Sequence, residues 1–364
     1  MKKAPHIHRL SIHSFRNSPG YASAVRGYAS FPERLHHELT SRQLPLFFDY
    51  LQPQQSHLLN LTLTDLFPEF NRISPKTILP TITRPSYLPP AHHLVYFPPQ
   101  VTLSQLLGDG TDILHTPGAP FNRRLWAGGG LRFAATNRLR LDGGRAVCIE
   151  RIRDVIVKGQ AGEEKIIVKI ERLIGTVQEE ETEPEIRKRI WSDSEAMDAH
   201  TSILENRDLV FMRDKTAAQL VQDKASFSQT CRTIKSPANP VFHYEMKPTR
   251  ALLFRFSALT FNAHSIHLDN GYTSNIEGYR NLLVHGPLTL TLIVTALRHH
   301  LHGRGLDIID INYKNLAPLF VEDQLVICGR PKPTKNSVWD VWIERKDGGV
   351  AVRGTIHLES AYKN

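Results

Sequence analysis

The 364-residue sequence lacks several features that mark large classes of protein. It has no uninterrupted run of about 18 apolar residues, so we expect no transmembrane helix. No interleaved aromatic and basic motif typical of RNA binding is present, so we expect no nucleic-acid partner. Only three cysteines occur, Cys148, Cys231 and Cys328, and their wide spacing fits neither a disulfide framework nor a metal motif. We therefore expect buried free thiols in a reducing compartment.

Acidic residues are absent from the start of the chain, where Glu33 is the first acid. The same stretch holds several serines and five basic residues, namely Lys2, Lys3, Arg9, Arg16 and Arg26. This composition is typical of an organellar presequence, so we predict a mitochondrial presequence over residues 1–32 and a location in the matrix. A disordered basic tail is the alternative. The formal charge of +9 suits an anionic partner, but five of these charges lie in the stretch before Glu33.

What remains is an ordinary globular composition, with 41% hydrophobic and 22% charged residues. The length suggests two domains, or one domain built twice. We expect an amino-terminal half over residues 33–175 and a carboxy-terminal half over residues 216–364. Residues 176–215 are in part acidic, then basic, then acidic, a pattern that favours a solvated linker between them.

Turn residues and apolar alternation predict antiparallel strands in both halves. In the first half, turns near Asp142–Gly144 and Gly159–Gly162 separate three predicted strands. In the second half, a turn at Glu322–Asp323 separates two strands, and a hairpin turns at Asp347–Gly349. The same order in both halves indicates a duplication.

A clear helix is predicted between the two sets of strands, over "GPLTLTLIVTALRHHLHG" at residues 286–303. Pro287 suits the first helical position, and Gly303 can end the helix. Its apolar residues occupy nearly all faces, which is typical of a buried helix. An antiparallel sheet around one buried helix is the hot-dog arrangement. We therefore predict an α+β fold, a double hot-dog.

Candidate functional residues lie in "FNAHSIHLDN" at residues 261–270, after the apolar run "ALLFRFSAL", which we predict to be a strand. His267 is suited to general acid–base chemistry because a neutral imidazole titrates near pH 6.5. Gly286 opens the buried helix, where a free backbone N–H and the helix dipole favour negative charge. A short span joins the two, so both can face one crevice.

The neighbouring polar residues have several interpretations. Asn262 cannot act as a base, but its amide can orient water. His264 is either a second acid or base or a brace for the loop, and His285 packs or orients the loop before the helix. The spacing of His264 and His267 with Asp269 does not suit zinc. We expect neither a metal nor a cofactor.

At this point the sequence resembles a known family, the MaoC-like, R-specific enoyl-thioester hydratases. The resemblance rests on "FRFSALTFNAHSIHLDNGY" followed by "LLVHGPLTLTL" and extends over roughly residues 40 to 360. The usual family motif is Ser-Gly-Asp-x-Asn-Pro-(Leu/Ile)-His. With its last histidine on His267, Asn262 takes the aspartate position and His264 the asparagine position. These departures are similar to the "TFNxHRIHYD" pattern of fungal mitochondrial 3-hydroxyacyl-thioester dehydratases and bacterial mesaconyl-C4-CoA hydratases.

The resemblance implies an (R)-3-hydroxyacyl-thioester dehydratase, or trans-2-enoyl-thioester hydratase, in mitochondrial type II fatty acid synthesis. It implies catalysis by His267 and Asn262, a Gly286 N–H that holds the thioester carbonyl, and support from His264 and His285. The implied substrate is carried by acyl carrier protein or CoA, and a homo-oligomer stays open. Two alternatives are a mesaconyl-type short-chain acyl-CoA hydratase and a non-catalytic acyl-thioester-binding protein. A hot-dog thioesterase fits the "HGP" sequence less well.

Overall fold

The computed structural model describes residues 30–67, 77–191, 200–226 and 233–361. Its centre is a ten-stranded sheet in the order β1-β3-β4-β5-β2-β7-β10-β9-β8-β6, and every neighbouring pair is antiparallel. The strands are β1 (Phe47–Tyr50), β2 (Arg123–Phe133), β3 (Arg145–Lys158), β4 (Lys165–Thr176), β5 (Ile203–Met212), β6 (Phe242–Met246), β7 (Leu306–Asn315), β8 (Leu325–Lys332), β9 (Lys335–Arg345) and β10 (Val350–Ser360). The helices are α1 (Phe31–Thr40), α2 (Pro53–Leu63), α3 (Glu183–Ile190), α4 (Ala217–Ser226), α5 (Arg250–Leu259), α6 (Asn270–Asn275) and α7 (Gly286–His300).

The sheet consists of two five-stranded halves with the same topology. In the first half the chain runs β1, α2, β2, β3, β4, β5, and the strands lie in the order β1-β3-β4-β5-β2. In the second half it runs β6, α7, β7, β8, β9, β10, with the matching order β6-β8-β9-β10-β7. The halves join where β2 pairs with β7. The predicted α+β double hot-dog is therefore confirmed, and the shared topology supports a duplication.

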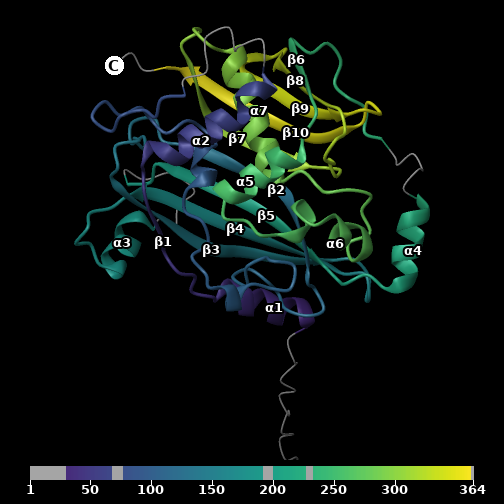
Figure 1. Ribbon diagram of the computed structural model, residues 1–364. Coiled ribbons are helices and arrows are strands. Elements are labelled where there is room, and N and C mark those ends of the chain that lie inside the picture. Colours follow the sequence, from purple (N-terminus) through teal and green to yellow (C-terminus); the bar gives the residue numbers. More distant parts are fainter. Residues whose placement is uncertain (1–29, 68–76, 192–199, 227–232, 362–364) are drawn as a thin grey trace, which may run out of the picture.

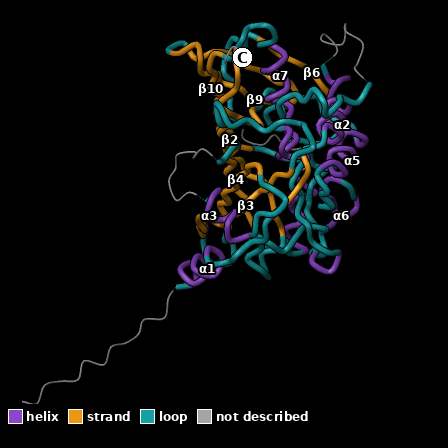
Figure 2. Tube along the Cα trace, turned by 90° about the vertical axis from the view of Figure 1, so that its left-hand side faces the viewer, coloured by secondary structure: helices purple, strands orange, loops and turns teal. Residues whose placement is uncertain are grey.

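Helix α7 is the buried helix that the sequence predicts. It lies over strands of the second half (Figure 1), and the side chains from Leu288 to Val294 are buried on all faces. Its apolar residues join one large core with strands of both halves. Helices α2, α5 and α6 lie on one side of the sheet and α3 on the other (Figure 2). No described helix is long and apolar enough to cross a membrane.

The two halves differ in where their long connections lie. Residues 64–122 connect α2 to β2, whereas residues 301–305 suffice between α7 and β7. Conversely, residues 247–285 connect β6 to α7, whereas residues 51–52 suffice between β1 and α2. One long connection from each half therefore reaches the helix-bearing side of the sheet, where the two contact each other.

Two predictions from the sequence are wrong. The run Ala251–Leu259 belongs to helix α5, not to a strand: Thr249 caps it, and Leu252, Leu253 and Phe256 are buried at helical spacing. A short apolar run suits both the side-chain period of a helix and that of a strand, so it does not distinguish the two elements. The segment that we expected to be a linker contains strand β5, which lies between β4 and β2 in the sheet. The alternating charges therefore did not indicate a solvated linker throughout this segment.

Other expectations meet the described residues only in part. Residues 1–29 of the expected presequence lie outside them, and Phe31 and Pro32 open α1. Cys148 and Cys328 are buried free thiols, as predicted. Cys231 lies outside the described residues. The turns predicted around β3, β4 and β7–β10 are confirmed.

Candidate active site

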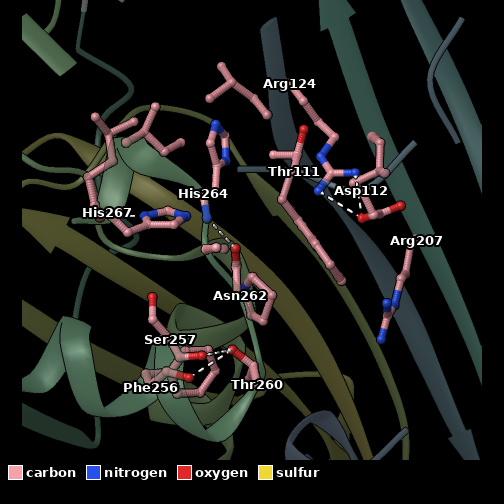
Figure 3. A pocket seen from close by; sticks show the side chains of 18 of the residues that line it. Thr111, Asp112, Arg124, Arg207, Phe256, Ser257, Thr260, Asn262, His264 and His267 are labelled. Carbon is pink, nitrogen blue, oxygen red and sulfur yellow. Dashed lines mark hydrogen bonds and ion pairs between the residues drawn. The ribbon is translucent and has the colours of Figure 1, made fainter. Parts of the chain in front are cut away.

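A cavity of about 800 Å³ lies where the two long connections meet the sheet. Residues from both halves line it, including Thr111 and Arg124 from the first half and His264, His267 and Gly286 from the second. Figure 3 shows His264 and His267 on one side of the view and Arg124 and Arg207 on the other. Asn262, His264, His267 and Gly286 all line this cavity.

His267 is buried, and one nitrogen of its ring is fixed by the backbone. Its Nδ1 lies 2.8 Å from the carbonyl oxygen of Leu283. Because a carbonyl oxygen can only accept, Nδ1 carries the hydrogen, and the neutral ring keeps its lone pair on Nε2. Burial, followed by the nearby rings of His285 and His264, holds the pKa of His267 well below 6.5. The imidazole is therefore neutral near pH 7, with Nε2 available as a base.

His285 occupies the N-cap position of α7, and its ring packs against that of His267, outside the cavity lining. The two rings stack with centroids 3.7 Å apart. His285 Nε2 lies 2.8 Å from the hydroxyl oxygen of Ser257 on α5. Burial, with a smaller effect of His264, lowers the pKa of His285 to about 3, so its ring is also neutral. The expected role of His285 in packing and orientation agrees with this position.

Gly286 begins α7, and its backbone N–H has no hydrogen-bond partner within the described part of the chain. Helix starts leave such groups free, and the helix dipole adds partial positive charge there. An added Cβ at Gly286 would lie 2.8 Å from Cβ of Trp126 and 2.9 Å from Nδ2 of Asn315. Glycine is therefore needed where β2 approaches the helix start.

Asn262 braces the loop that carries the histidines. Its Oδ1 accepts the backbone N–H of His264 at 2.9 Å, and its own backbone N–H donates to the carbonyl of Ser257 at 2.8 Å. The residue is half-buried and lines the cavity. Oδ1 of Asn262 thus holds the histidine loop in place, and its role in orienting water stays a prediction.

His264 contacts a residue that the sequence analysis does not single out. Its Nε2 lies 3.3 Å from Oδ2 of Asp109, in the long connection of the first half. Its ring meets that of His267 edge-on, with centroids 5.5 Å apart. Both Asp109 and His264 are buried. Whether His264 braces the loop or acts as an acid or base therefore depends on how Asp109 affects its ring.

The opposite wall of the cavity carries charged side chains from the first half. Arg124 is paired with Asp112 at 3.1 Å, and Arg207 with Glu205 at 2.7 Å. Deeper in the wall, the fully buried Arg172 contacts Glu150 and Glu205. The cavity thus has a polar wall formed by balanced ion pairs.

Comparison with known proteins identifies the family. The model of the family described as hydroxyacyl-thioester dehydratase type 2 matches residues 91–321. The chain belongs to this family. The matched segment contains every predicted site residue and also Asp109, so it includes the long connection of the second half and residues 91–122 of the first.

Two curated relatives agree with this assignment. Mesaconyl-C(4)-CoA hydratase of Chloroflexus aurantiacus is 29% identical over 288 residues, which cover 79% of this chain and 88% of the relative. The mitochondrial hydroxyacyl-thioester dehydratase type 2 of Schizosaccharomyces pombe is 28% identical over 266 residues, which cover 71% of this chain and 81% of the relative. A solved MaoC-like dehydratase from Phytophthora capsici has a TM-score of 0.55 at 12% identity, covers 89% of this chain and 98% of its own, and supports the fold.

Three contacts of the candidate site residues in this family member could not be predicted from the sequence. Asp109 lies in "LGDGTD", which signals a turn but no chemistry. Ser257 lies on the helix that was predicted to be a strand, so its bond to His285 could not be foreseen. The Leu283 carbonyl that orients His267 is a backbone atom, which a sequence motif does not reveal.

Proposed function

We propose that this chain removes water from (R)-3-hydroxyacyl thioesters, and adds it to trans-2-enoyl thioesters in reverse, with His267 as the general base. As a member of the type 2 hydroxyacyl-thioester dehydratase family it is a hydro-lyase. One observation carries the assignment to this site: the Nε2 lone pair of His267 and the free N–H of Gly286 belong to one cavity.

The two groups match the two demands of the reaction. In dehydration, His267 Nε2 takes the proton from the α-carbon, and negative charge develops on the thioester oxygen. The N–H of Gly286, at the positive end of α7, stabilises that oxygen. The Cα–H electrons form the double bond as the Cβ–O bond breaks, and the hydroxyl leaves as water after it gains a proton. Asn262 orients the hydroxyl group or the attacking water.

The experiment is an absorbance assay for the conjugated enoyl thioester, with crotonyl, decenoyl and mesaconyl thioesters as substrates. We expect absorbance to fall on hydration of at least one of them. Binding of all three without any absorbance change would contradict catalysis and favour the acyl-thioester-binding alternative.

A second candidate, a mesaconyl-type short-chain hydratase, is favoured by the cavity wall opposite the histidines. Arg124 and Arg207 lie there, and a carboxylate at the far end of an acyl group can pair with a guanidinium. A relative at 29% identity is named mesaconyl-C(4)-CoA hydratase. Faster turnover of mesaconyl than of decenoyl thioester would select this candidate, and the reverse order would select the fatty acyl substrate.

We further propose that the chain is an enzyme of fatty acid synthesis in the mitochondrial matrix. Its substrates would be acyl groups attached to acyl carrier protein. The acid-free start before Glu33 and the mitochondrial relative from Schizosaccharomyces pombe support this location. Residues 1–40 fused to a fluorescent reporter are expected to carry it into mitochondria. A reporter that stays in the cytosol would contradict the targeting proposal and would not bear on the proposed reaction.

A further inference from the structure

The contact between Asp109 and His264 joins the two halves of the protein at the cavity. Asp109 Oδ1 accepts the backbone N–H of Thr111 at 2.9 Å and the Thr111 hydroxyl at 2.7 Å. These two bonds occupy Oδ1. Oδ2 lies 3.3 Å from Nε2 of His264, close enough for an ion pair but without the geometry of a hydrogen bond. Burial alone would raise the pKa of Asp109, but its contacts with His264 and Thr111 lower it to about 2. Asp109 is therefore an anion at working pH.

The turn that carries Asp109 is docked tightly on the histidine loop. The backbone N–H of Ser265 donates to the carbonyl of Asp109 at 2.8 Å. Gly110 has a φ of +83°, and a Cβ there would lie only 2.2 Å from the carbonyl oxygen of Ala263. A glycine is thus required both for the left-handed backbone and for the close approach. The two loops are therefore in close backbone contact, although they come from opposite halves of the chain.

The carboxylate determines how the His264 ring presents itself to the cavity. A carboxylate can only accept, so it favours the tautomer with hydrogen on Nε2. Nδ1 has no hydrogen-bond partner in the parts of the chain that the structure describes, and the residue lines the cavity. Such pairs are often long in unliganded sites and tighten when the substrate binds. Other titratable or charged groups also act on this cluster: His264 interacts with His267 and His285, Asp109 interacts with Tyr272, and Arg124 acts on His267.

We propose that His264 is a second catalytic acid–base group, facing the substrate through Nδ1, and that Asp109 from the amino-terminal half is its positioning residue. This inference rests on the proposed function and assigns the proton donor that the reaction needs besides His267. Asn262 cannot fill this role because an amide does not titrate. The site is then complete only when both halves of the double hot-dog are present.

The proton balance of the dehydration follows from this assignment. His267 Nε2 receives the proton from Cα, and the Cα–H electron pair forms the Cα=Cβ bond. The Cβ–O bond breaks, and the leaving hydroxyl takes a proton from Nδ1 of protonated His264 to form water. His264 ends neutral, with its Nε2–H directed at Asp109. Solvent then removes one proton from His267 and returns one to His264, which restores the starting state.

The test is a double-variant comparison of His264→Ala, Asp109→Asn and their combination in the full-length protein, with crotonyl-CoA as the probe. We expect His264→Ala to lower kcat about a hundredfold and Asp109→Asn at least about tenfold, with little change in KM. The combined variant is expected to be no slower than His264→Ala alone, because Asp109 acts only through His264. Asp269→Asn is the matched control: this exposed aspartate caps α6 outside the cavity, and asparagine caps helices equally well.

The outcomes separate this inference from the proposed function. A wild-type protein that hydrates no enoyl thioester contradicts the proposed function and the inference with it. If the wild type is active, three results for Asp109→Asn would overturn the inference alone. These are a kcat equal to that of the control, a change in KM only, or a loss of kcat that adds to that of His264→Ala in the combined variant. If Asp109→Asn does not fold, Thr111→Val replaces it, since it removes only the hydroxyl that holds Asp109 Oδ1. Thr111→Val is then expected to lower kcat as Asp109→Asn would, and to cause no further loss when it is combined with His264→Ala.

Discussion

His267 is held in one protonation state by its surroundings. Its Nδ1–H is bound to the Leu283 carbonyl, and burial together with His285 and His264 keeps its pKa well below 6.5. A base with a lowered pKa is protonated, and thus inactive, only when the pH falls well below 6.5. We therefore expect kcat/KM for dehydration of an (R)-3-hydroxyacyl thioester to fall on acidification only well below pH 6.5, which a pH–rate profile measures from the rise of enoyl absorbance. A loss of dehydration on acidification that is centred at pH 6.5 or above would argue against His267 as the base.

Replacement of His267 by alanine tests the same residue directly. We expect turnover to fall by at least about a hundredfold, the lower end for general acid–base catalysis. His243→Ala is the control, because His243 is an exposed histidine on β6. Equal rates for the two variants, with both folded by circular dichroism, would remove His267 from the mechanism.

Buried histidines also make stability depend on pH. Burial lowers the pKa of both His92 and His285 to about 3, whereas an unfolded histidine titrates near about 6.5. Above pH 6.5 neither state binds these protons, so no stability is lost. Below it only the unfolded state binds them, and each histidine costs up to about 1.4 kcal/mol per pH unit until pH 3. Thermal midpoints are expected to be level from pH 8 to 7 and to fall by pH 5.5; a flat curve would contradict neutral buried rings.

At the scale of elements, the start of α7 combines a free N–H with a crowded approach to β2. A methyl group at Gly286 would contact Cβ of Trp126 at 2.8 Å, so Gly286→Ala must move the helix start or the strand. Loss of one aligned donor is expected to lower kcat about a hundredfold. Gly108→Ala is a fitting control because an added Cβ there meets nothing within 4 Å. Gly286→Ala keeps the N–H but crowds its position, so undiminished turnover would show that the alignment of this donor is not needed.

The strands of the first half hold a buried ion-pair network behind the cavity. Arg172 contacts Glu150 at 2.6 Å and Glu205 at 3.0 Å, and all three side chains are buried. Arg172→Met leaves two buried carboxylates without this partner, which we expect to cost about 3–5 kcal/mol of unfolding free energy. Arg153→Met, which breaks a more exposed pair with Glu171, is expected to cost at most about 1 kcal/mol. Denaturant titrations measure both, and equal small losses would show that the network is not needed for stability.

Elements with strong local signals were predictable, and long-range contacts were not. Helix α7 has apolar residues on all faces between Pro287 and Gly303, and the sheet turns have Gly and Asp at fixed places, so both were foreseen. Helix α5 is a short apolar run, whose length and composition suit either period. Asp109 reaches His264 only through tertiary docking across 155 positions of sequence, and no local pattern encodes such a contact.

At the scale of the molecule, duplication explains why the site has two walls. Each half has the same strand order, but only the second has the histidine loop before its helix, and only the first has the long connection after its helix. Joined through β2 and β7, the halves bring one long connection each to a shared cavity. The histidine wall and the charged wall thus arise from different copies of one fold.

The whole-molecule charge bears on the choice of carrier. The chain has a formal charge of +9, but five of its basic residues precede Glu33, so the part from Glu33 onward is only modestly positive. Attraction between a basic enzyme and an acidic carrier protein weakens as salt screens it. We expect turnover of acyl-carrier thioesters to fall more steeply from low to physiological salt than turnover of a small acyl-cysteamine thioester. A CoA thioester cannot serve as the neutral reference, because its phosphates are also anionic. Equal salt slopes for carrier and cysteamine substrates would argue against carrier docking and favour the mesaconyl-type CoA hydratase.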